Sequence, residues 1–140
     1  MFKLVKIMNS GVNVPEPEAI PTESGLCCSA GSALILDSDL GYLIDGGETA
    51  VPTHIIMQNP NEDAPTSYCY RIHPNMVFEA PIYDGYDSIG PGSPLALKSV
   101  DLDGQAAVRL ANSPEETVAT VFYVAPNLKH GDKILLTFNK

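Results

Sequence analysis

The sequence predicts an all-β protein, and three observations carry this prediction. Its 140 residues include 12 prolines and 11 glycines, and the longest stretch without either runs only from Glu115 to Ala125. Because both residue types destabilise a helix interior, the sequence disfavours long helices. Short runs of β-branched and aromatic residues lie between the interruptions, as is typical of strands. With 44% hydrophobic and 18% charged residues, the chain also has enough apolar material for one globular domain.

The predicted strands follow one another along the chain, separated by turn residues. Residues 2–8 alternate apolar side chains with lysine, the pattern of a strand with one buried face. The acidic segment Asp37–Gly41 has the composition of a tight hairpin turn, and Pro74-Asn75 also suits a turn. We expect strands at residues 2–8, 33–37, 41–45, 53–58, 66–73, 76–82, 94–99, 105–110, 117–124 and 132–139.

The segment Asn9–Ser24, between the first two predicted strands, is rich in proline. Its prolines favour extended or polyproline II conformations. The segment is either a connector across the surface or an arm that lies along a neighbouring molecule, since prolines reduce the entropy lost on docking. As an arm, it would use apolar anchors stiffened by prolines. The candidate contact residues of this segment are Val12, Val14, Pro15, Pro17, Ile20 and Pro21.

A short pattern recurs along the chain. Gly31–Leu36 is echoed by Gly92–Leu97 and, more loosely, by Gly131–Leu136. A glycine followed by alternating apolar residues suits a sharp turn that leads into a strand. After the first two copies, the chain continues through an acidic turn to a strand that opens with Thr53 or Thr120. Chance similarity between short hairpins is the alternative explanation.

From this repeat we predict a compact β-barrel or sandwich built from two similar β units, with an extended Pro-rich N-terminal arm. The whole chain, residues 1–140, forms a single β domain. Within it, residues 9–24 are the arm, residues 25–83 the first unit and residues 84–140 the second unit.

The net charge of the chain excludes some classes of binding partner. Asp and Glu number 17 against 8 Lys and Arg, which gives a net charge of −9, and the basic residues are scattered. We therefore expect neither nucleic acid nor an anionic membrane as a partner. The sequence has no apolar run of membrane-spanning length and no signal-peptide pattern at its start, so we expect a protein that is made and kept soluble.

No residue pattern predicts catalysis, a metal site or a cofactor. Asp37-x-Asp39-x-Gly41 resembles the start of a calcium loop, but the residues that follow lack the further oxygen ligands. The serines form no nucleophile elbow, and no glycine-rich phosphate loop is present. We expect a protein that is not an enzyme, with no metal and no cofactor.

The remaining histidines, cysteines and aromatic residues each have a structural explanation. Residues 66–82 concentrate aromatic side chains, either as core and cross-strand pairs or as an exposed edge used for association. The histidines lack metal-ligand spacing, and we expect them to be solvent-facing or hydrogen-bonded: His54, His73 and His130. The cysteines form no zinc pattern, and we expect small buried or half-buried thiols: Cys27, Cys28 and Cys69.

Several short stretches of the chain together carry a resemblance to a known protein family. They are Phe2–Lys6 with Asn13–Glu16, Gly31–Leu34, Pro52–Ile55, Tyr70–Glu79 and Gly131–Leu136. Together they resemble the capsid decoration, or head auxiliary, proteins encoded beside major capsid genes in tailed phages and prophages. The resemblance covers most of the chain. It breaks at residues 135–139, which replace an alternation of valine and arginine, so no contact is carried over to the C-terminus.

The resemblance implies a structural virion protein that binds the outer surface of the expanded phage capsid and stabilises contacts between capsomers. Its partner would be the major capsid protein. Its location would be the capsid exterior, after synthesis in the host cytoplasm, and threefold sites suggest a homotrimer. A non-catalytic β-barrel binding module of a phage tail, fibre or cell surface, recognising protein or carbohydrate, is the alternative. The absence of Trp disfavours carbohydrate as the ligand of such a module. A small barrel enzyme is a third possible class of function.

Overall fold

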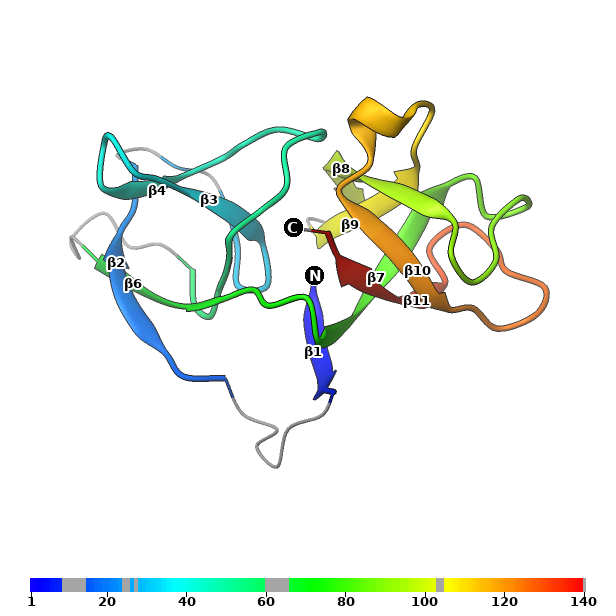
Figure 1. Cartoon of the computed structure of the whole chain (residues 1–140), viewed down its shortest axis with the longest axis horizontal. Coiled ribbons are helices and arrows are strands. Elements are labelled where there is room, and N and C mark those ends of the chain that lie inside the picture. Colours follow the sequence, from blue (N-terminus) through cyan, green and yellow to red (C-terminus); the bar gives the residue numbers. More distant parts are fainter. Residues whose placement is uncertain (9–14, 24–25, 27, 60–65, 103–104, 140) are drawn as a thin grey trace.

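The computed structural model describes residues 1–8, 15–23, 26, 28–59, 66–102 and 105–139, and this part of the chain is all-β (Figure 1). It confirms the predicted fold class. One short 3₁₀ helix, η1 (Pro114–Glu116), accompanies the strands. The strands are β1 (Lys3–Ile7), β2 (Glu18–Pro21), β3 (Ala33–Asp37), β4 (Tyr42–Ile44), β5 (His54–Ile56), β6 (Thr66–Arg71), β7 (Met76–Asp84), β8 (Pro94–Leu102), β9 (Gln105–Leu110), β10 (Ala119–Tyr123) and β11 (Lys133–Phe138).

Every strand that the sequence predicts is present, and β2 is an addition. The structure therefore corrects the prediction of an extended arm at residues 18–21 of the 9–24 segment, because Glu18–Pro21 pairs with β6. Strand β2 tolerates a proline at its end because β6 is its one strand-length neighbour. Residues 9–14 lie outside the described part of the chain.

The second unit, β7–β11, is a closed five-stranded barrel. Its strands follow the order β7-β11-β10-β8-β9, and β9 closes the barrel by pairing in parallel with β7. Strand β1 adds to β7 as an antiparallel neighbour. The barrel interior holds large apolar side chains such as Phe78, Ile82 and Leu136, all of them fully buried.

The first unit, β2–β6, has the same strand order. Its sheet runs β2-β6-β5-β3-β4 and curls back on itself, so that Thr22, directly after β2, forms a parallel bridge with Leu43 of β4. The Glu23 amide also donates to the Leu43 carbonyl, at 2.9 Å. The apolar side chains enclosed by this sheet are Ile20, Leu34, Leu43, Ile56 and Cys69.

The predicted repeat is thus present in the fold. The amides of Gly31, Gly92 and Gly131 each donate at 2.8 Å to a neighbouring strand, and all three glycines have φ between 87° and 89°. This left-handed conformation is inexpensive for glycine. The predicted match of Thr53 with Thr120 is wrong: the amides of Thr53 and Val118 occupy the equivalent places, donating to Leu34 and Leu95.

The boundary between the units also differs from the sequence prediction. Strand β7 was expected in a first unit ending at residue 83, but it belongs to the second barrel, so the units meet at residues 72–75. Pro74-Asn75 forms the expected turn there, closed by the Met76 amide on the His73 carbonyl. The Asp37–Gly41 hairpin is confirmed too, since Asp37 Oδ1 accepts from the amides of Asp39 and Leu40.

One apolar core joins the two units, as a single domain requires. Side chains that point away from the interior of the first unit, Ile55 and Tyr70, pack with the second barrel and with Phe2 at the chain start. Tyr70 stacks on Phe78 with ring centroids 6.4 Å apart, and Phe2 contacts Phe138 edge-on at 5.2 Å. The two lobes seen in Figure 1 therefore form one continuous body.

Candidate functional site

The structure describes Pro15, Pro17, Ile20 and Pro21 among the predicted contact residues of the proline-rich segment. Val12 and Val14 lie outside the described residues, Pro15 is half-buried and Pro17 is exposed. Pro21 belongs to β2, and Ile20 is buried inside the first unit. The prediction that Ile20 anchors a partner is corrected on this ground, because its side chain already stabilises the core.

Three polar side chains line one end of the first unit: Glu18, His54 and Arg71, from β2, β5 and β6. We call them the polar end. Alternation along each strand directs them inward, on the same face as Ile20, Ile56 and Cys69. Arg71 Nε lies 3.9 Å from Glu18 Oε1, and His54 Nε2 lies 3.9 Å from Glu18 Oε2. Both contacts are at the outer limit of an ion pair.

His54 is fully buried, which corrects the expectation that it might face solvent; the hydrogen-bonded alternative holds. Its Nδ1 lies 2.8 Å from Thr53 Oγ1, which also accepts the Leu36 amide at 2.7 Å. Desolvation lowers the pKa of His54, with help from the Arg71 charge, while Glu18 opposes the shift. The imidazole is therefore neutral at pH 7.

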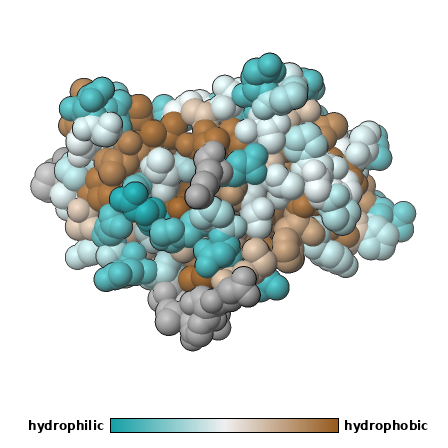
Figure 2. Space-filling view, viewed as in Figure 1, coloured by the Kyte–Doolittle hydropathy of each residue, from teal (hydrophilic) through white to brown (hydrophobic). Residues whose placement is uncertain are grey.

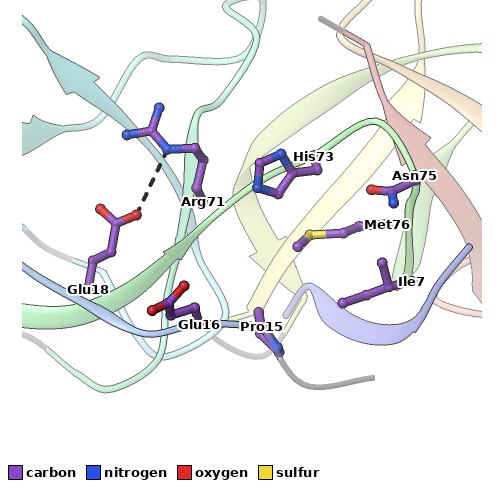
Figure 3. A pocket seen from close by; sticks show the side chains of 8 residues that line it. All are labelled: Ile7, Pro15, Glu16, Glu18, Arg71, His73, Asn75 and Met76. Atoms are coloured by element: carbon purple, nitrogen blue, oxygen red, sulfur yellow. Dashed lines mark ion pairs between the residues drawn. The ribbon is translucent and has the colours of Figure 1, made fainter. Parts of the chain in front are cut away.

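A pocket of about 490 Å³ opens beside the polar end, between β2–β6 and the β1–β7 edge of the second unit (Figure 3). One part of its lining is apolar and the other is charged or polar. The lining residues are Ile7, Pro15, Glu16, Glu18, Arg71, His73, Asn75 and Met76. Its volume is within the range of ligand pockets, about 300–1,000 Å³.

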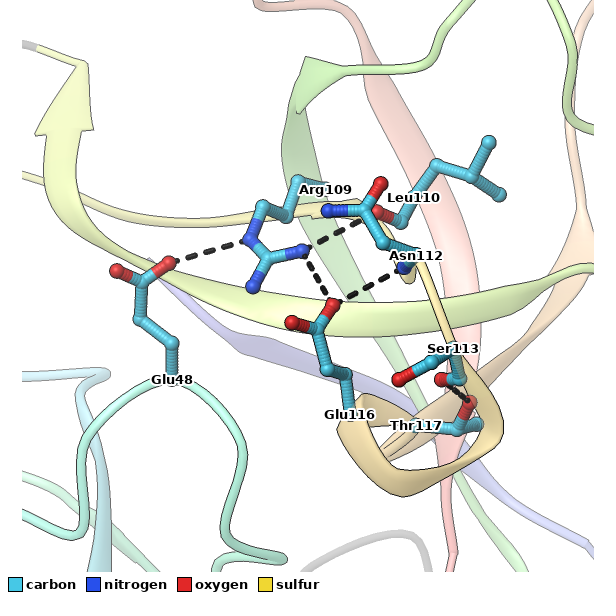
Figure 4. Close-up of polar contacts among 7 residues, drawn as sticks. All are labelled: Glu48, Arg109, Leu110, Asn112, Ser113, Glu116 and Thr117. Atoms are coloured by element: carbon cyan, nitrogen blue, oxygen red, sulfur yellow. Dashed lines mark hydrogen bonds and ion pairs between the residues drawn. The ribbon is translucent and has the colours of Figure 1, made fainter.

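A second polar cluster joins the two units through Arg109, Glu48 and Glu116 (Figure 4). Arg109 of β9, 14% exposed, places Nε 3.2 Å from Glu48 in the loop after β4 and Nη1 3.1 Å from Glu116 of η1. Burial alone would lower the pKa of Arg109, but the hydrogen bonds and charges of Glu116 and Glu48 raise it. The Leu97 amide donates to the Glu48 carbonyl at 3.0 Å. This cluster connects the loop after β4 of the first unit to β8, β9 and η1 of the second.

We expect Glu116 to make the stability of the protein sensitive to acid. The Asn112 amide and the Arg109 guanidinium lower the pKa of Glu116 below its usual 4.5. A carboxylate with a lowered pKa stabilises the fold above its unfolded pKa, and this contribution disappears as the pH falls through the folded value. The free energies of unfolding of the protein and of Glu116→Gln should therefore differ at pH 7, and the difference should shrink as the pH falls below 4.5 and through the lowered pKa of Glu116. A stability gap that persists unchanged at pH 3 would contradict this assignment.

Exposed apolar side chains occupy equivalent places on the two units. In the first unit, Met57 comes directly after the inward residue Ile56, and its amide donates to the carbonyl of Tyr68 on the neighbouring strand. We call the exposed side chains of Met57 and Tyr68 the first apolar patch. In the second unit, Val121 is the inward residue, and the second apolar patch is the exposed pair Phe122 and Tyr123, which lies beside the half-buried Leu135. Tyr68 is 55% exposed and Tyr123 54%. Figure 2 shows one face of the molecule, where apolar surface alternates with hydrophilic side chains over both units.

The aromatic segment 66–82 contains both buried core residues and an exposed aromatic residue, so each of its two predicted roles applies to part of it. Tyr70 and Phe78 belong to the core, whereas Tyr68 is exposed on the same strand as Tyr70. Cys69 is a buried thiol whose pKa is raised to about 11, chiefly by desolvation. Cys28 is half-buried, as expected, and Cys27 lies outside the described residues.

Within the described ranges, no group of three or more His, Cys, Asp and Glu side chains is placed to hold a metal ion. None of the described helices is long and apolar enough to cross a membrane. Comparison of the chain with protein-family models, with curated proteins and with solved structures finds no match.

Proposed function

We propose that the protein is a structural virion protein that binds the outer surface of a phage capsid and stabilises contacts between neighbouring capsomers. The motifs that resemble capsid decoration proteins support this, and so does the distribution of exposed apolar side chains. The net charge of −9 suits a protein that is kept away from the packaged DNA. The partner in this proposal is the major capsid protein.

The observation that carries the proposal is the repetition of an apolar patch at the same register position of both units. Single exposed apolar residues are ordinary on soluble proteins and need no explanation. Here the exposed Met57 and Phe122 lie at matching positions, each directly after an inward residue that pairs with the neighbouring strand: Ile56 with Cys69, and Val121 with Leu136. Each has an exposed tyrosine close by, Tyr68 in the first patch and Tyr123 in the second. A protein with two similar patches can bind two neighbouring subunits of a capsid, because the symmetric shell presents the same subunit surface many times.

The rigid connection between the units strengthens this argument. The shared core and the contacts of Arg109 fix the distance between the two patches. Once one patch is bound, the other is held at a high effective concentration near its own site, which raises the overall affinity without any new contact. The prediction that Val12 and Val14 contribute an arm stays as a further part of the proposal.

Co-sedimentation with purified expanded capsids tests the proposal, using the variants Tyr68→Ala and Tyr123→Ala. We expect the unmodified protein to sediment with the shells and each variant to bind about tenfold or more weakly, because exposed tyrosines are frequent hot spots of interfaces. The double variant should lose detectable binding.

Leu40→Ala is the matched control. Leu40 is as exposed as Tyr68, at 55%, but lies in the β3–β4 turn outside both patches, so its loss should leave binding unchanged. Failure of the folded, unmodified protein to sediment with expanded shells would contradict the proposal. That result would favour a binding module of a tail, fibre or cell surface.

A further inference from the structure

The side chains at one end of the first unit differ from those at the equivalent positions of the second unit. Glu18 and Phe78 both pair with an inward residue of the next strand, Cys69 and Leu136. By the same register, His54 matches Ala119 and Arg71 matches Phe138. In the second unit these positions are buried: Phe78 and Phe138 are in edge contact at 5.2 Å, and Phe2 covers them. At this end the first unit has charged, partly exposed side chains, whereas packed phenylalanine rings close the second unit.

A buried polar atom at this end lacks a partner. Thr53 Oγ1 accepts the Leu36 amide and can donate its own proton to Nδ1 of His54; in this tautomer the imidazole proton is on Nε2. Nε2 has no hydrogen-bond partner among the described residues. It faces Glu18, a residue of the pocket lining, across 3.9 Å. An unpaired buried donor is costly, so any rearrangement of Glu18 that satisfies it is favoured.

The pocket beside Glu18 has the charge and shape for a basic side chain. Among the described lining residues, Glu16 and Glu18 supply two carboxylates and Arg71 supplies one guanidinium (Figure 3). The weak Arg71 contact, at 3.9 Å, leaves the Glu18 carboxylate able to accept from another donor. Ile7, Pro15 and Met76 form an apolar surface that suits the aliphatic stem of lysine or arginine.

We propose that this pocket binds an extended basic segment of a partner protein. The ammonium or guanidinium head of the segment pairs with Glu16 and Glu18, and its stem packs on Ile7, Pro15 and Met76. The Arg71 guanidinium, displaced from Glu18, donates to a backbone carbonyl of the segment. Glu18 then shifts toward His54 and accepts from Nε2. The inference goes beyond capsid binding and does not depend on which assembly carries the segment.

A titration with short peptides, followed by amide chemical shifts in the ¹⁵N-labelled full chain, tests this inference without any capsid. The probe is acetyl-Ala-Arg-Ala-Arg-Ala-amide, and the matched control peptide replaces both arginines by neutral citrulline. We expect saturable shifts centred on Glu16, Glu18, Arg71 and Asn75 with the arginine peptide. The citrulline peptide should bind about tenfold or more weakly, the loss expected for a charged hydrogen bond.

Two variants with the same change of net charge complete the experiment. Glu16→Gln/Glu18→Gln should weaken the arginine peptide about tenfold or more, whereas Glu115→Gln/Asp39→Gln, at exposed positions away from the pocket, should not. Retained thermal unfolding transitions show that each variant is folded. Equal binding of the citrulline peptide, equal weakening by both variants, or tighter binding of acetyl-Ala-Glu-Ala-Glu-Ala-amide would overturn the proposal.

Discussion

Replacement of Phe78 by alanine is expected to lower the free energy of unfolding by about 3–5 kcal/mol, the range observed for buried Phe→Ala changes. Phe78 is fully buried and contacts Phe138 at 5.2 Å and Tyr70 at 6.4 Å between ring centroids. Because Tyr70 comes from the first unit, the ring supports both the barrel interior and the joint between the units. The loss should lower the midpoint of thermal unfolding by on the order of 10 °C.

Phe122→Ala is the matched control for this prediction, since the same atoms are removed from an exposed position. Phe122 is 39% exposed, and its recorded partner is the Lys6 ammonium, 5.3 Å from the ring centroid. Its loss should cost less than about 1 kcal/mol. Denaturant unfolding followed by circular dichroism measures both variants. Equal destabilisation by the two changes would mean that the ring of Phe78 does not hold the shared core as described.

Much of the fold follows from local sequence, and β2 shows where local reasoning stops. The alternation at residues 2–8 and the turn residues at Asp37–Gly41 and Pro74-Asn75 each act within a few residues, so they could be predicted. Strand β2 contains Glu18, Ala19, Ile20 and Pro21, a composition with little strand propensity. It exists because Ile20 fills the first unit and because β6 supplies the ladder, and both are tertiary effects.

The polar end of the first unit could not be predicted for a related reason. Glu18, His54 and Arg71 are far apart in the sequence and meet only when the sheet curls with one particular register. A signal was nevertheless present. Whether Thr53 is placed opposite Val118 or Thr120, His54 matches an inward residue, Ala119 or Val121, because a shift of two residues along a strand keeps the same face. The repeat therefore indicated that His54 points inward, although it gave no sign of Glu18 or Arg71 beside it.

The ion pairs of Arg109 give the second large prediction: Arg109→Ala should lower the free energy of unfolding by about 2–3 kcal/mol. The change removes the charged hydrogen bonds from Arg109 to Glu48 and Glu116, and a charged hydrogen bond contributes about 1.5–3 kcal/mol. Glu48, at 3.2 Å, would lose this contact between the units. The amide of Leu97, which donates to the Glu48 carbonyl, should then exchange its hydrogen faster than in the unmodified protein.

Lys133→Ala is the control that separates this cluster from ordinary surface charge. Lys133 pairs with Glu79 at 3.5 Å, but its side chain is 68% exposed, so its loss should cost less than about 1 kcal/mol and leave exchange at Leu97 unchanged. If Arg109→Ala is no more destabilising than Lys133→Ala, the units are held by the apolar core alone. If it destabilises the protein and accelerates exchange at Leu97, the cluster is part of what fixes the distance between the two apolar patches. In that case the same variant should also weaken any binding that requires both patches at once, because the second contact is gained only when the spacing is fixed.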